Sequence, residues 1–186
     1  MIFPKTYKCL NINEFKEGEF RITPIRYEDR LDIMKWRNEQ LYHLRQVKPL
    51  TEKDQENYFK KTISKIFNQD KPGQILFSYL KNNRCIGYGG LVHINWIDKN
   101  AELSFVLMTD ISEVNFTNNW KTFLKLIEKV AFEELNLKKI YTYAFDLRPQ
   151  IYPIFEDSDF VREAELKNHC YVNNEFKSVI IHSKYN

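Results

Sequence analysis

The chain has few glycines and few cysteines, and each shortage excludes a class of protein. Of its 186 residues, 5 are glycine and 3 are cysteine. Cys9, Cys85 and Cys170 are odd in number, far apart and outside any Cys-x-x-Cys or Cys/His ligand pattern. Neither a disulfide framework nor a zinc site is therefore indicated. We expect three reduced thiols and no metal.

Long apolar runs and a strong charge imbalance are also missing. No run reaches the roughly 20 apolar residues of a transmembrane helix, and the N-terminal segment lacks the apolar stretch of a signal peptide. The 28 basic and 25 acidic residues leave a net charge of +3, spread along the chain. That balance does not favour a nucleic-acid partner. We expect a cytoplasmic protein that binds neither membranes nor nucleic acids.

Aromatic residues, in contrast, are plentiful. They make up 15% of the sequence, with 14 Phe and 11 Tyr, so we expect large flat side chains in the core and in any cleft. The length suits one domain with a substantial core. We expect a single domain over residues 1–186, with residues 1–19 as an irregular arm packed on the outside.

Residues 101–136 predict a strand, a polar loop and a long amphipathic helix. Apolar residues alternate over 101–108, a polar loop follows over 109–118, and apolar residues then recur at helical spacing from Trp120 to Leu135. Unpaired backbone N–H groups and the positive end of the helix dipole meet at such a helix start, which suits a phosphate group. The alternative is an ordinary strand-to-helix connection that binds nothing.

The other segments carry further local signals. Thr51 and Asp54 have capping-box spacing, and Pro24 argues for an edge position or a bulge in its strand. Gly87, Gly89 and Gly90 indicate a bulge or a close approach to the backbone. Strands are predicted over 20–27, 74–80, 85–96, 101–108, 139–145, 160–171 and 175–183, and helices over 29–40, 51–68, 120–135 and 148–157.

This order predicts an α/β (α+β) fold. Three strands in a meander followed by β-α-β crossovers give a mixed, mostly antiparallel sheet of about seven strands with helices on both faces. A crossover joins the strand before the long helix to the strand after it. We therefore expect these two strands to be parallel.

Three segments resemble the GNAT superfamily of acetyl-coenzyme A dependent N-acetyltransferases. They are INWIDKNAELSFVL, FLKLIEKVAFEELNLKKIYTYAF and IFEDSDFVREAEL, and the resemblance covers residues 20–183. The block IGYGGLVHINWIDKNAELSF is most similar to ribosomal-protein N-terminal acetyltransferases, and KWRN at 35–38 is similar to acetyltransferases of nucleotide-linked amino sugars. The resemblance implies a GNAT-like fold with a splayed central strand pair, acetyl-CoA as cosubstrate and a primary amine on a small molecule or peptide as acceptor. It also allows a homodimer.

The sequence departs from the family pattern at two places. The family's Arg/Gln-x-x-Gly-x-Gly/Ala loop corresponds to 115–120, which has no glycine and places Phe116 at a glycine position. Asn118 tolerates a left-handed backbone and can replace one glycine. The family's Asn-…-Tyr-Glu-x-x-Gly-Phe pattern begins here with Arg148 and has Phe155 at the tyrosine that often serves as general acid. These departures favour an alternative: a catalytically silent GNAT-like binding or assembly module with lost or weakened CoA binding.

Acyl transfer from a thioester to an amine needs a neutral amine, a polarised carbonyl and a proton source for the thiolate. Glu102 matches the family's frequent base position, and His93 on the preceding strand can share or replace that role. The alternatives are a surface carboxylate and a structural histidine. For the proton source we expect Tyr152, with Tyr141 and Tyr143 on a neighbouring strand as alternatives.

The resemblance also implies where the coenzyme and the acceptor bind. Backbone N–H groups of 105–108 would polarise the carbonyl if the strand pair splays. The expected coenzyme contacts are Phe105, Val106, Leu107, Met108, Asn115, Phe116, Thr117, Asn118, Asn119 and Arg148. The expected acceptor contacts are Trp36, Arg37, Asn38 and Tyr42, with Arg45 and Tyr58 beside them. The aromatic residues among these are core residues in the alternative reading. Because no cysteine has an evident base partner, we expect direct transfer in a ternary complex.

Overall fold

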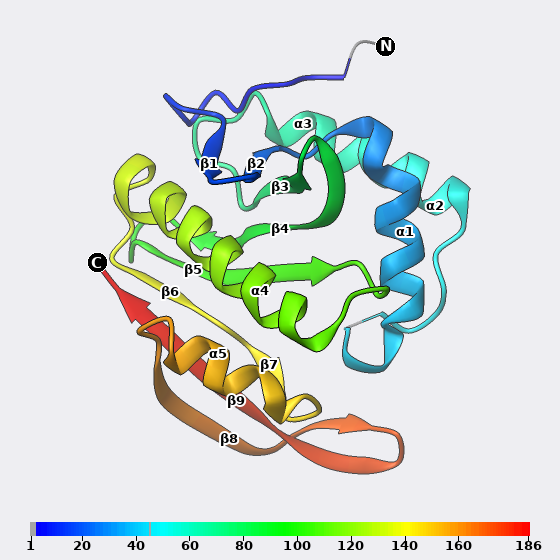
Figure 1. Ribbon diagram of the computed structural model, residues 1–186, viewed down its shortest axis with the longest axis vertical. Coiled ribbons are helices and arrows are strands. Elements are labelled where there is room, and N and C mark those ends of the chain that lie inside the picture. The colour runs from blue at the N-terminus through cyan, green and yellow to red at the C-terminus, as the bar shows by residue number, and fades with distance from the viewer. Residues whose placement is uncertain (1–2, 45) are drawn as a thin grey trace.

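The computed structural model describes residues 3–44 and 46–186. Within them, nine strands form one sheet in the order β1-β2-β3-β4-β5-β6-β9-β7, with β8 also paired to β9 (Figure 1). The pair β5–β6 is parallel, as predicted, and the other described pairs are antiparallel. The strands are β1 (Phe15–Glu17), β2 (Phe20–Pro24), β3 (Ile75–Lys81), β4 (Arg84–Asn95), β5 (Asn100–Leu107), β6 (Lys139–Tyr141), β7 (Ala144–Phe145), β8 (Val161–Val172) and β9 (Glu175–Tyr185).

Helices cover both faces of the sheet. Along β5, Phe105 stacks on Phe123 of α4, whereas its neighbour Ser104 faces a cleft formed with α1 and α2. Successive side chains of a strand point to opposite faces, so α4 lies on one face and α1 with α2 on the other. The helices are η1 (Tyr27–Asp29), α1 (Arg30–Glu39), η2 (Leu41–His43), α2 (Glu52–Tyr58), η3 (Phe59–Ile63), α3 (Ser64–Ile66), α4 (Glu113–Glu128), η4 (Lys129–Glu134), η5 (Pro149–Ile151) and α5 (Tyr152–Glu156), of which η3 and η4 are π-helical.

Two local predictions are confirmed in atomic detail. The amide of Asp54 donates to the Thr51 hydroxyl at 3.2 Å, and the Thr51 amide donates to the Asp54 carboxylate at 3.0 Å, which completes the capping box of α2. In β4, a Cβ built on Gly89 would lie 2.2 Å from the carbonyl oxygen of Ser104, and one on Gly90 would lie 2.0 Å from that of Ile75. Neighbouring backbones therefore approach β4 too closely for any side chain at these two positions.

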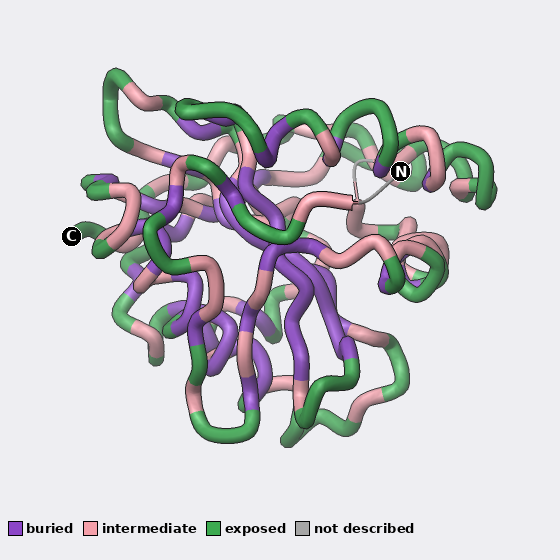
Figure 2. The backbone as a smooth tube through the Cα atoms, turned by 90° about the horizontal axis from the view of Figure 1, so that it is seen from above, coloured by how far each residue is buried: buried purple, intermediate pink, exposed green. Residues whose placement is uncertain are grey.

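The N-terminal arm runs along the outside of the molecule, and it anchors single side chains in the core (Figure 1). Tyr7 is 1% exposed, and its hydroxyl donates to the Leu76 carbonyl at 2.7 Å and accepts from the Leu76 amide at 3.2 Å. Its ring stacks on Phe67 with centroids 4.2 Å apart. The arm is thus fixed to β3 at Leu76, and Figure 2 shows that buried residues are concentrated in the central part of the fold.

The helix α4 begins earlier than predicted. It starts at Glu113, so residues 113–118 are helical and the connecting loop after β5 is short. Phe116 packs on Trp120, with ring centroids 6.2 Å apart, and so extends the apolar face of the helix towards its N-terminus. Packing of that apolar face against the rest of the protein extends the helix to Glu113, although residues 113–118 are mostly polar.

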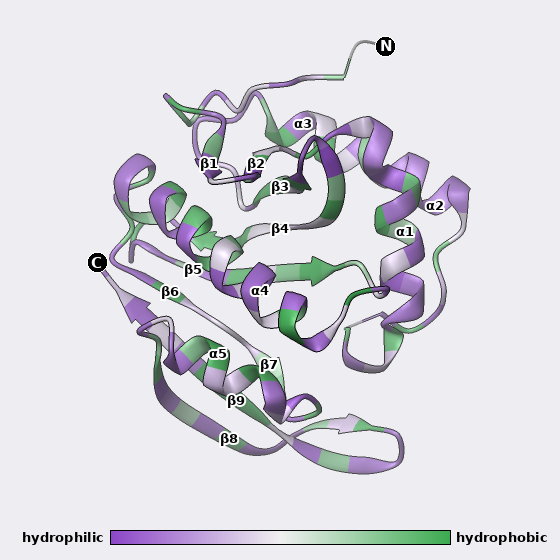
Figure 3. Cartoon of the chain, in the orientation of Figure 1, coloured by the Kyte–Doolittle hydropathy of each residue, from purple (hydrophilic) through white to green (hydrophobic). Residues whose placement is uncertain are grey.

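The predicted strand over 139–145 is split into β6 and β7. The break falls at Thr142, whose amide donates to the His182 carbonyl at 2.8 Å while its hydroxyl accepts from the His182 amide at 3.1 Å. The C-terminal hairpin of β8 and β9 forms as predicted. Figure 3 shows β8 as largely hydrophilic, in keeping with a strand that pairs on one side only. In the described part of the chain, no helix has the length and apolar character to cross a membrane.

The close approach at Gly89 generates a stability prediction. Gly89→Ala introduces a methyl group that meets the Ser104 carbonyl and the Phe123 ring, so we expect the free energy of unfolding to fall by about 1–3 kcal/mol in urea titrations. Gly73→Ala is the matched control, because nothing lies within 4 Å of the added Cβ. A Gly89 variant as stable as the Gly73 variant would contradict the packing described.

Candidate active site

The site begins where the parallel pair β5–β6 separates. The ladder joins residues 100–102 to 139–141 and ends at Glu102 opposite Tyr141. Beyond that point β7 pairs only with β9, so residues 103–107 have no described strand partner on this side. This opening is the splayed strand pair that the sequence predicts.

Aromatic rings fill the base of the opening and hold it apart. Phe105 stacks on Phe123 at 3.8 Å between centroids and meets Trp120 edge-on at 4.7 Å. Trp120 in turn meets Phe155 of α5 edge-on at 5.7 Å, and Phe155 lies 5.5 Å from the His182 ring on β9. Because these rings are buried between α4, α5 and the two strands, the strands cannot close without displacing them.

Backbone direction decides which amides face the opening. The Met108 amide donates to the Ile86 carbonyl of β4 at 2.9 Å, and the Val106 carbonyl also points towards β4. Alternation along an antiparallel strand then directs the amides of Phe105 and Leu107 to the opposite edge. Of the four residues expected to polarise a carbonyl, Phe105 and Leu107 therefore have their amides on the open edge of β5, and the amides of Val106 and Met108 face β4. Phe105 lines the opening itself, whereas Leu107 lines the groove beside α4.

Three hollows meet around this edge, and the first is the opening itself, which we call the gap cavity. It has a volume of about 230 Å³. It is bounded on one side by β5 and on the other by β6, β7 and the start of α5. The lining residues are Arg37, His43, Leu44, Glu102, Leu103, Ser104, Phe105, Trp120, Thr142, Tyr143, Ala144, Phe145, Arg148, Ile151 and Phe155.

The second hollow, the α1/α2 cleft, lies between those helices and the sheet. It shares Arg37 and Ser104 with the gap cavity and has a volume of about 320 Å³. Its lining is mostly apolar, with amide and hydroxyl groups at Gln55, Gln74 and Tyr58. The remaining lining residues are Ile25, Ile33, Leu50, Phe59, Leu76, Tyr88 and Val92.

The third hollow, the α4 groove, runs from the end of β5 past the start of α4. It shares Arg148 with the gap cavity and has a volume of about 490 Å³. The Phe116 ring forms part of its wall and leaves this volume open. The other lining residues are Glu39, Gln40, Tyr42, Leu107, Met108, Thr109, Ile111, Glu113, Thr117, Gln150 and Ile154.

Three of the predicted coenzyme contacts do not reach this groove. Asn115 and Asn118 are exposed residues of α4, and Asn118 is not among the residues with a left-handed backbone. Asn119 is 4% exposed and donates to the Asn115 carbonyl at 2.6 Å within the helix. The early start of α4 is the reason, because it removes the loop in which these side chains were expected to lie.

Glu102 and His93 lie together, as the sequence reading allowed. The Nδ1 atom of His93 is 2.8 Å from a carboxylate oxygen of Glu102. The Glu102 side chain is 13% exposed and lines the gap cavity, whereas the His93 side chain is 63% exposed. The carboxylate is thus the inner member of the pair and the imidazole connects it to solvent. This arrangement suits a base that passes its proton outward.

Tyr152 points away from the gap cavity. Its hydroxyl donates to Asp146 at 2.8 Å, and its ring stacks on His182 at 5.2 Å between centroids. Burial and the Asp146 carboxylate raise the pKa of Tyr152, which makes it a weaker acid. Tyr143 is the tyrosine that lines the cavity, whereas Tyr141 does not.

The predicted acceptor residues divide into different roles. Trp36 is 6% exposed in the hydrophobic core, so the expectation of a stacking platform is wrong. The Asn38 side chain donates to the Leu50 carbonyl at 2.9 Å and accepts from the Leu50 amide at 2.8 Å. These two bonds fix the loop between α1 and α2. Tyr42 lines the α4 groove instead of the acceptor side. Arg45 lies outside the described residues.

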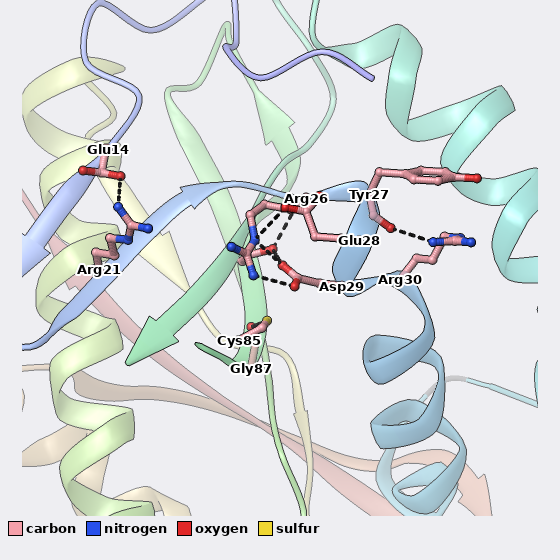
Figure 4. A network of polar contacts seen from close by, with 10 residues as sticks. Glu14, Arg21, Arg26, Tyr27, Glu28, Asp29, Arg30, Cys85 and Gly87 are labelled. Carbon is pink, nitrogen blue, oxygen red and sulfur yellow. Dashed lines mark hydrogen bonds and ion pairs between the residues drawn. The ribbon is translucent and has the colours of Figure 1, made fainter. Parts of the chain in front are cut away.

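Arg37 is held at the junction of two hollows by a rigid helix. The start of α1 is fixed by buried Asp29, which accepts two bonds from Arg26, of 2.7 and 2.6 Å, and one of 2.6 Å from Ser78 on β3 (Figure 4). Cys85 lies beside this network, and burial raises the pKa of its thiol to about 12. The thiol therefore stays protonated and is no nucleophile.

The sequence reading did not identify His43, which also lines the gap cavity. Burial, together with the nearby charge of Arg148, lowers the pKa of His43 to about 3. Its Nε2 atom lies 3.1 Å from the Gln40 side-chain oxygen. The cavity thus contains a histidine that is neutral at physiological pH. No spacing in the sequence marks it, because its environment comes from η2 and from Arg148 more than a hundred positions later.

The lowered pKa of His43 predicts a pH effect on stability. On acidification the unfolded chain binds this proton from about pH 6.5, whereas the folded protein resists until about pH 3, so folding loses stability across that range. In His43→Gln we expect the loss of unfolding free energy between pH 7 and pH 5 to be about 1 kcal/mol smaller, allowing for solvent screening. Urea titrations at both pH values measure it, and an unchanged difference would contradict the assignment.

A sequence model of the GNAT acetyltransferase domain matches residues 22–180. A spermidine N(1)-acetyltransferase of Vibrio cholerae is 28% identical over 104 residues, which span 54% of this chain and 58% of that relative. The chain's match therefore spans little more than half the length of this curated relative.

Solved structures share the fold. The crystal structure of spermidine N-acetyltransferase from Vibrio cholerae in complex with CoA and spermine has a TM-score of 0.79 at 19% identity, with 91% of this chain and 96% of that chain covered. A dodecameric structure of that enzyme in an intermediate state has a TM-score of 0.74 at 18% identity, covering 91% and 95%. Since the domain match takes in most of the sequence and the fold agrees with it, the chain belongs to the GNAT acetyltransferase family.

Proposed function

We propose that the protein is an N-acetyltransferase that moves an acetyl group from acetyl-CoA to a primary amine by direct transfer. The observation that carries this proposal is the open edge of β5, where Phe105 lines the gap cavity and Leu107 lines the adjoining α4 groove. One hollow leads to that cavity from α4 and another from α1 and α2. A donor and an acceptor can therefore reach the same backbone edge from opposite sides.

The residues around the gap cavity support each step. Glu102 takes a proton from the ammonium group, and His93 passes that proton to solvent. The neutral amine then attacks the thioester carbon while the Phe105 amide binds the developing oxyanion. The Leu107 amide, two positions further along the same edge of β5, is left to bind another carbonyl of the coenzyme. The carbon–sulfur bond breaks, and the amine nitrogen loses its second proton to Glu102, which has already released the first proton through His93. The CoA thiolate takes up a proton from solvent or from Tyr143, which solvent then reprotonates. No enzyme nucleophile takes part, since the Cys85 thiol stays protonated.

The α4 groove is the proposed coenzyme site. Arg148 lines both this groove and the gap cavity, and no described carboxylate forms an ion pair with it. Burial lowers the pKa of Arg148, so an anionic ligand would relieve the cost of its charge. The related structure that contains CoA supports the same use of the fold. Phe116 narrows the groove where the family has glycine.

Two carboxylates in the α4 groove favour the alternative, a catalytically silent binding module. Glu39 and Glu113 line the α4 groove, and both carry the charge that coenzyme phosphates repel. Phe155 also removes the family's usual general acid. Loss of that group would cost roughly 10²–10⁴-fold in rate without abolishing turnover, because a thiolate leaves readily. Coenzyme binding without thiol release across a panel of amines would favour the silent module.

The acceptor carries a primary amine, and two kinds of evidence bear on its class. A protein N-terminus or an amino sugar follows from the sequence resemblance, whereas the relatives found by comparison are named for spermidine. The α1/α2 cleft is the proposed acceptor site in either case. A homodimer remains a prediction. The dodecameric structure of a relative supports only the coarser statement that proteins of this fold form oligomers.

The first test removes the base. In Glu102→Gln we expect kcat/KM for amine acetylation to fall roughly 10²–10⁴-fold, because the amine stays protonated, while acetyl-CoA affinity in calorimetry stays within about twofold. In His93→Asn we expect a smaller fall in kcat/KM, because water can carry the proton from Glu102 to solvent in place of the imidazole. Glu175→Gln, on the exposed hairpin, is the matched control and should keep full activity. An active Glu102→Gln enzyme would exclude this base.

A second test uses two charges of opposite sign in the α4 groove. Arg148→Gln should weaken acetyl-CoA binding about tenfold, whereas Glu113→Gln should tighten it about two- to fivefold by removing a negative charge at the helix start. Lys167→Gln, exposed on β8, should leave affinity unchanged. Calorimetric titration of each variant measures these shifts. Equal acetyl-CoA affinities in all three variants would exclude the α4 groove as the coenzyme site.

A further inference from the structure

We infer that the acceptor carries an oxyanion at the end away from its amine, and that Arg37 binds this group. The inference rests on the proposed function and assigns the α1/α2 cleft to an ω-amino carboxylate or amino phosphate with a compact apolar body. It sets this chain apart from relatives named for spermidine, which is a polycation.

The guanidinium of Arg37 is positioned but not neutralised. Its Nε donates to the Gln46 side chain at 2.9 Å and its Nη1 donates to the Tyr88 hydroxyl at 2.6 Å. A guanidinium has five N–H groups, so three remain for a ligand. Among the described residues no carboxylate lies within ion-pair distance of it. A fixed planar cation with free donors on a cleft wall is suited to a carboxylate or phosphate.

The cleft also lacks what a polyamine needs. Among the described residues that line it none is Asp or Glu, and Arg37 is the one charged residue of that set. A chain of ammonium groups entering it would lose hydration, meet a like charge and gain no ion pair. The walls are instead formed by Ile25, Ile33 and Phe59, which suit an apolar body.

The two ends of such an acceptor fit two residues on the same side of the sheet. Glu102 and Ser104 are two positions apart on β5, so their side chains share one face. Ser104 and Arg37 line both the cleft and the gap cavity, and Glu102 lines the cavity. An amine beside Glu102 therefore shares the gap cavity with Arg37, and the rest of the molecule can extend past Arg37 into the cleft. Negative and positive groups at the two ends complement an acceptor of opposite polarity.

A series of four amines with one ring tests this assignment. They are 4-(aminomethyl)benzoate, the corresponding phosphonate, the neutral 4-(aminomethyl)benzyl alcohol and the diamine 1,4-bis(aminomethyl)benzene. CoA release at saturating acetyl-CoA gives kcat and KM, and calorimetry on the CoA-saturated protein gives affinity. We expect at least one anionic amine to exceed the alcohol and the diamine about tenfold in kcat/KM or affinity. The carboxylate and phosphonate arms identify which oxyanion is preferred.

Arg37 variants separate recognition from folding. Arg37→Gln should raise KM for the anionic amine about tenfold, with little change in kcat for that amine or in KM for the alcohol. Arg37→Lys should recover part of the lost affinity for the anionic amine. Tyr88→Phe, which removes one bond to the guanidinium, gives a milder second variant if Arg37→Gln unfolds. Lys35→Gln removes the same charge from an exposed position on α1 and is the control.

The outcomes separate this inference from the proposed function. CoA release that favours the diamine, or that is indifferent to Arg37, overturns the inference and leaves the transferase in place. Absence of CoA release from every amine, with no acetyl-CoA binding, overturns the proposed function. In that case the same calorimetric series on the protein without coenzyme decides, because anion binding that depends on Arg37 supports the cleft assignment and equal affinities overturn it.

Discussion

The end of the β5–β6 ladder at Glu102 and Tyr141 is the constraint on which the rest of the site depends. Two features impose it. Thr142 turns its amide and hydroxyl to β9, and the rings of Trp120 and Phe155 fill the space that a longer strand pair would occupy. Since strand amides are obligatory hydrogen-bonding groups, an edge opened in this way is suited to bind an added acceptor. The fold thus leaves a strand edge open at the place where we propose that the oxyanion binds.

Charge is distributed along the path through the molecule. Arg148 lies where the α4 groove meets the opening, Glu102 lies within it, and Arg37 lies where it meets the α1/α2 cleft. His43 adds no charge, because burial keeps it neutral. A cation thus lies at each junction with a carboxylate between them, an order that matches an anionic donor, a central amine and an anionic acceptor tail. Uncompensated guanidinium groups are costly in a partly buried site, which is why ligand anions are their expected partners.

Sequence patterns predicted the elements whose causes are local. The hairpins at Asn82–Asn83 and Asn173–Asn174 follow from residues that accept positive φ, and all four have it. The capping box at Thr51 has the same local character. The start of α4, the burial of Tyr7 and the role of His43 depend on contacts with distant residues, so no local pattern contained them. Trp36 shows the reverse error, since an aromatic residue at helical spacing belonged to the core.

The most direct test of the central claim is a backbone amide titration by nuclear magnetic resonance with acetyl-CoA. If the opened edge of β5 receives the thioester, the amide signals of Phe105 and Leu107 should shift most along that strand, with smaller changes at Val106 and Met108. Saturating coenzyme that leaves Phe105 and Leu107 unmoved would contradict the claim.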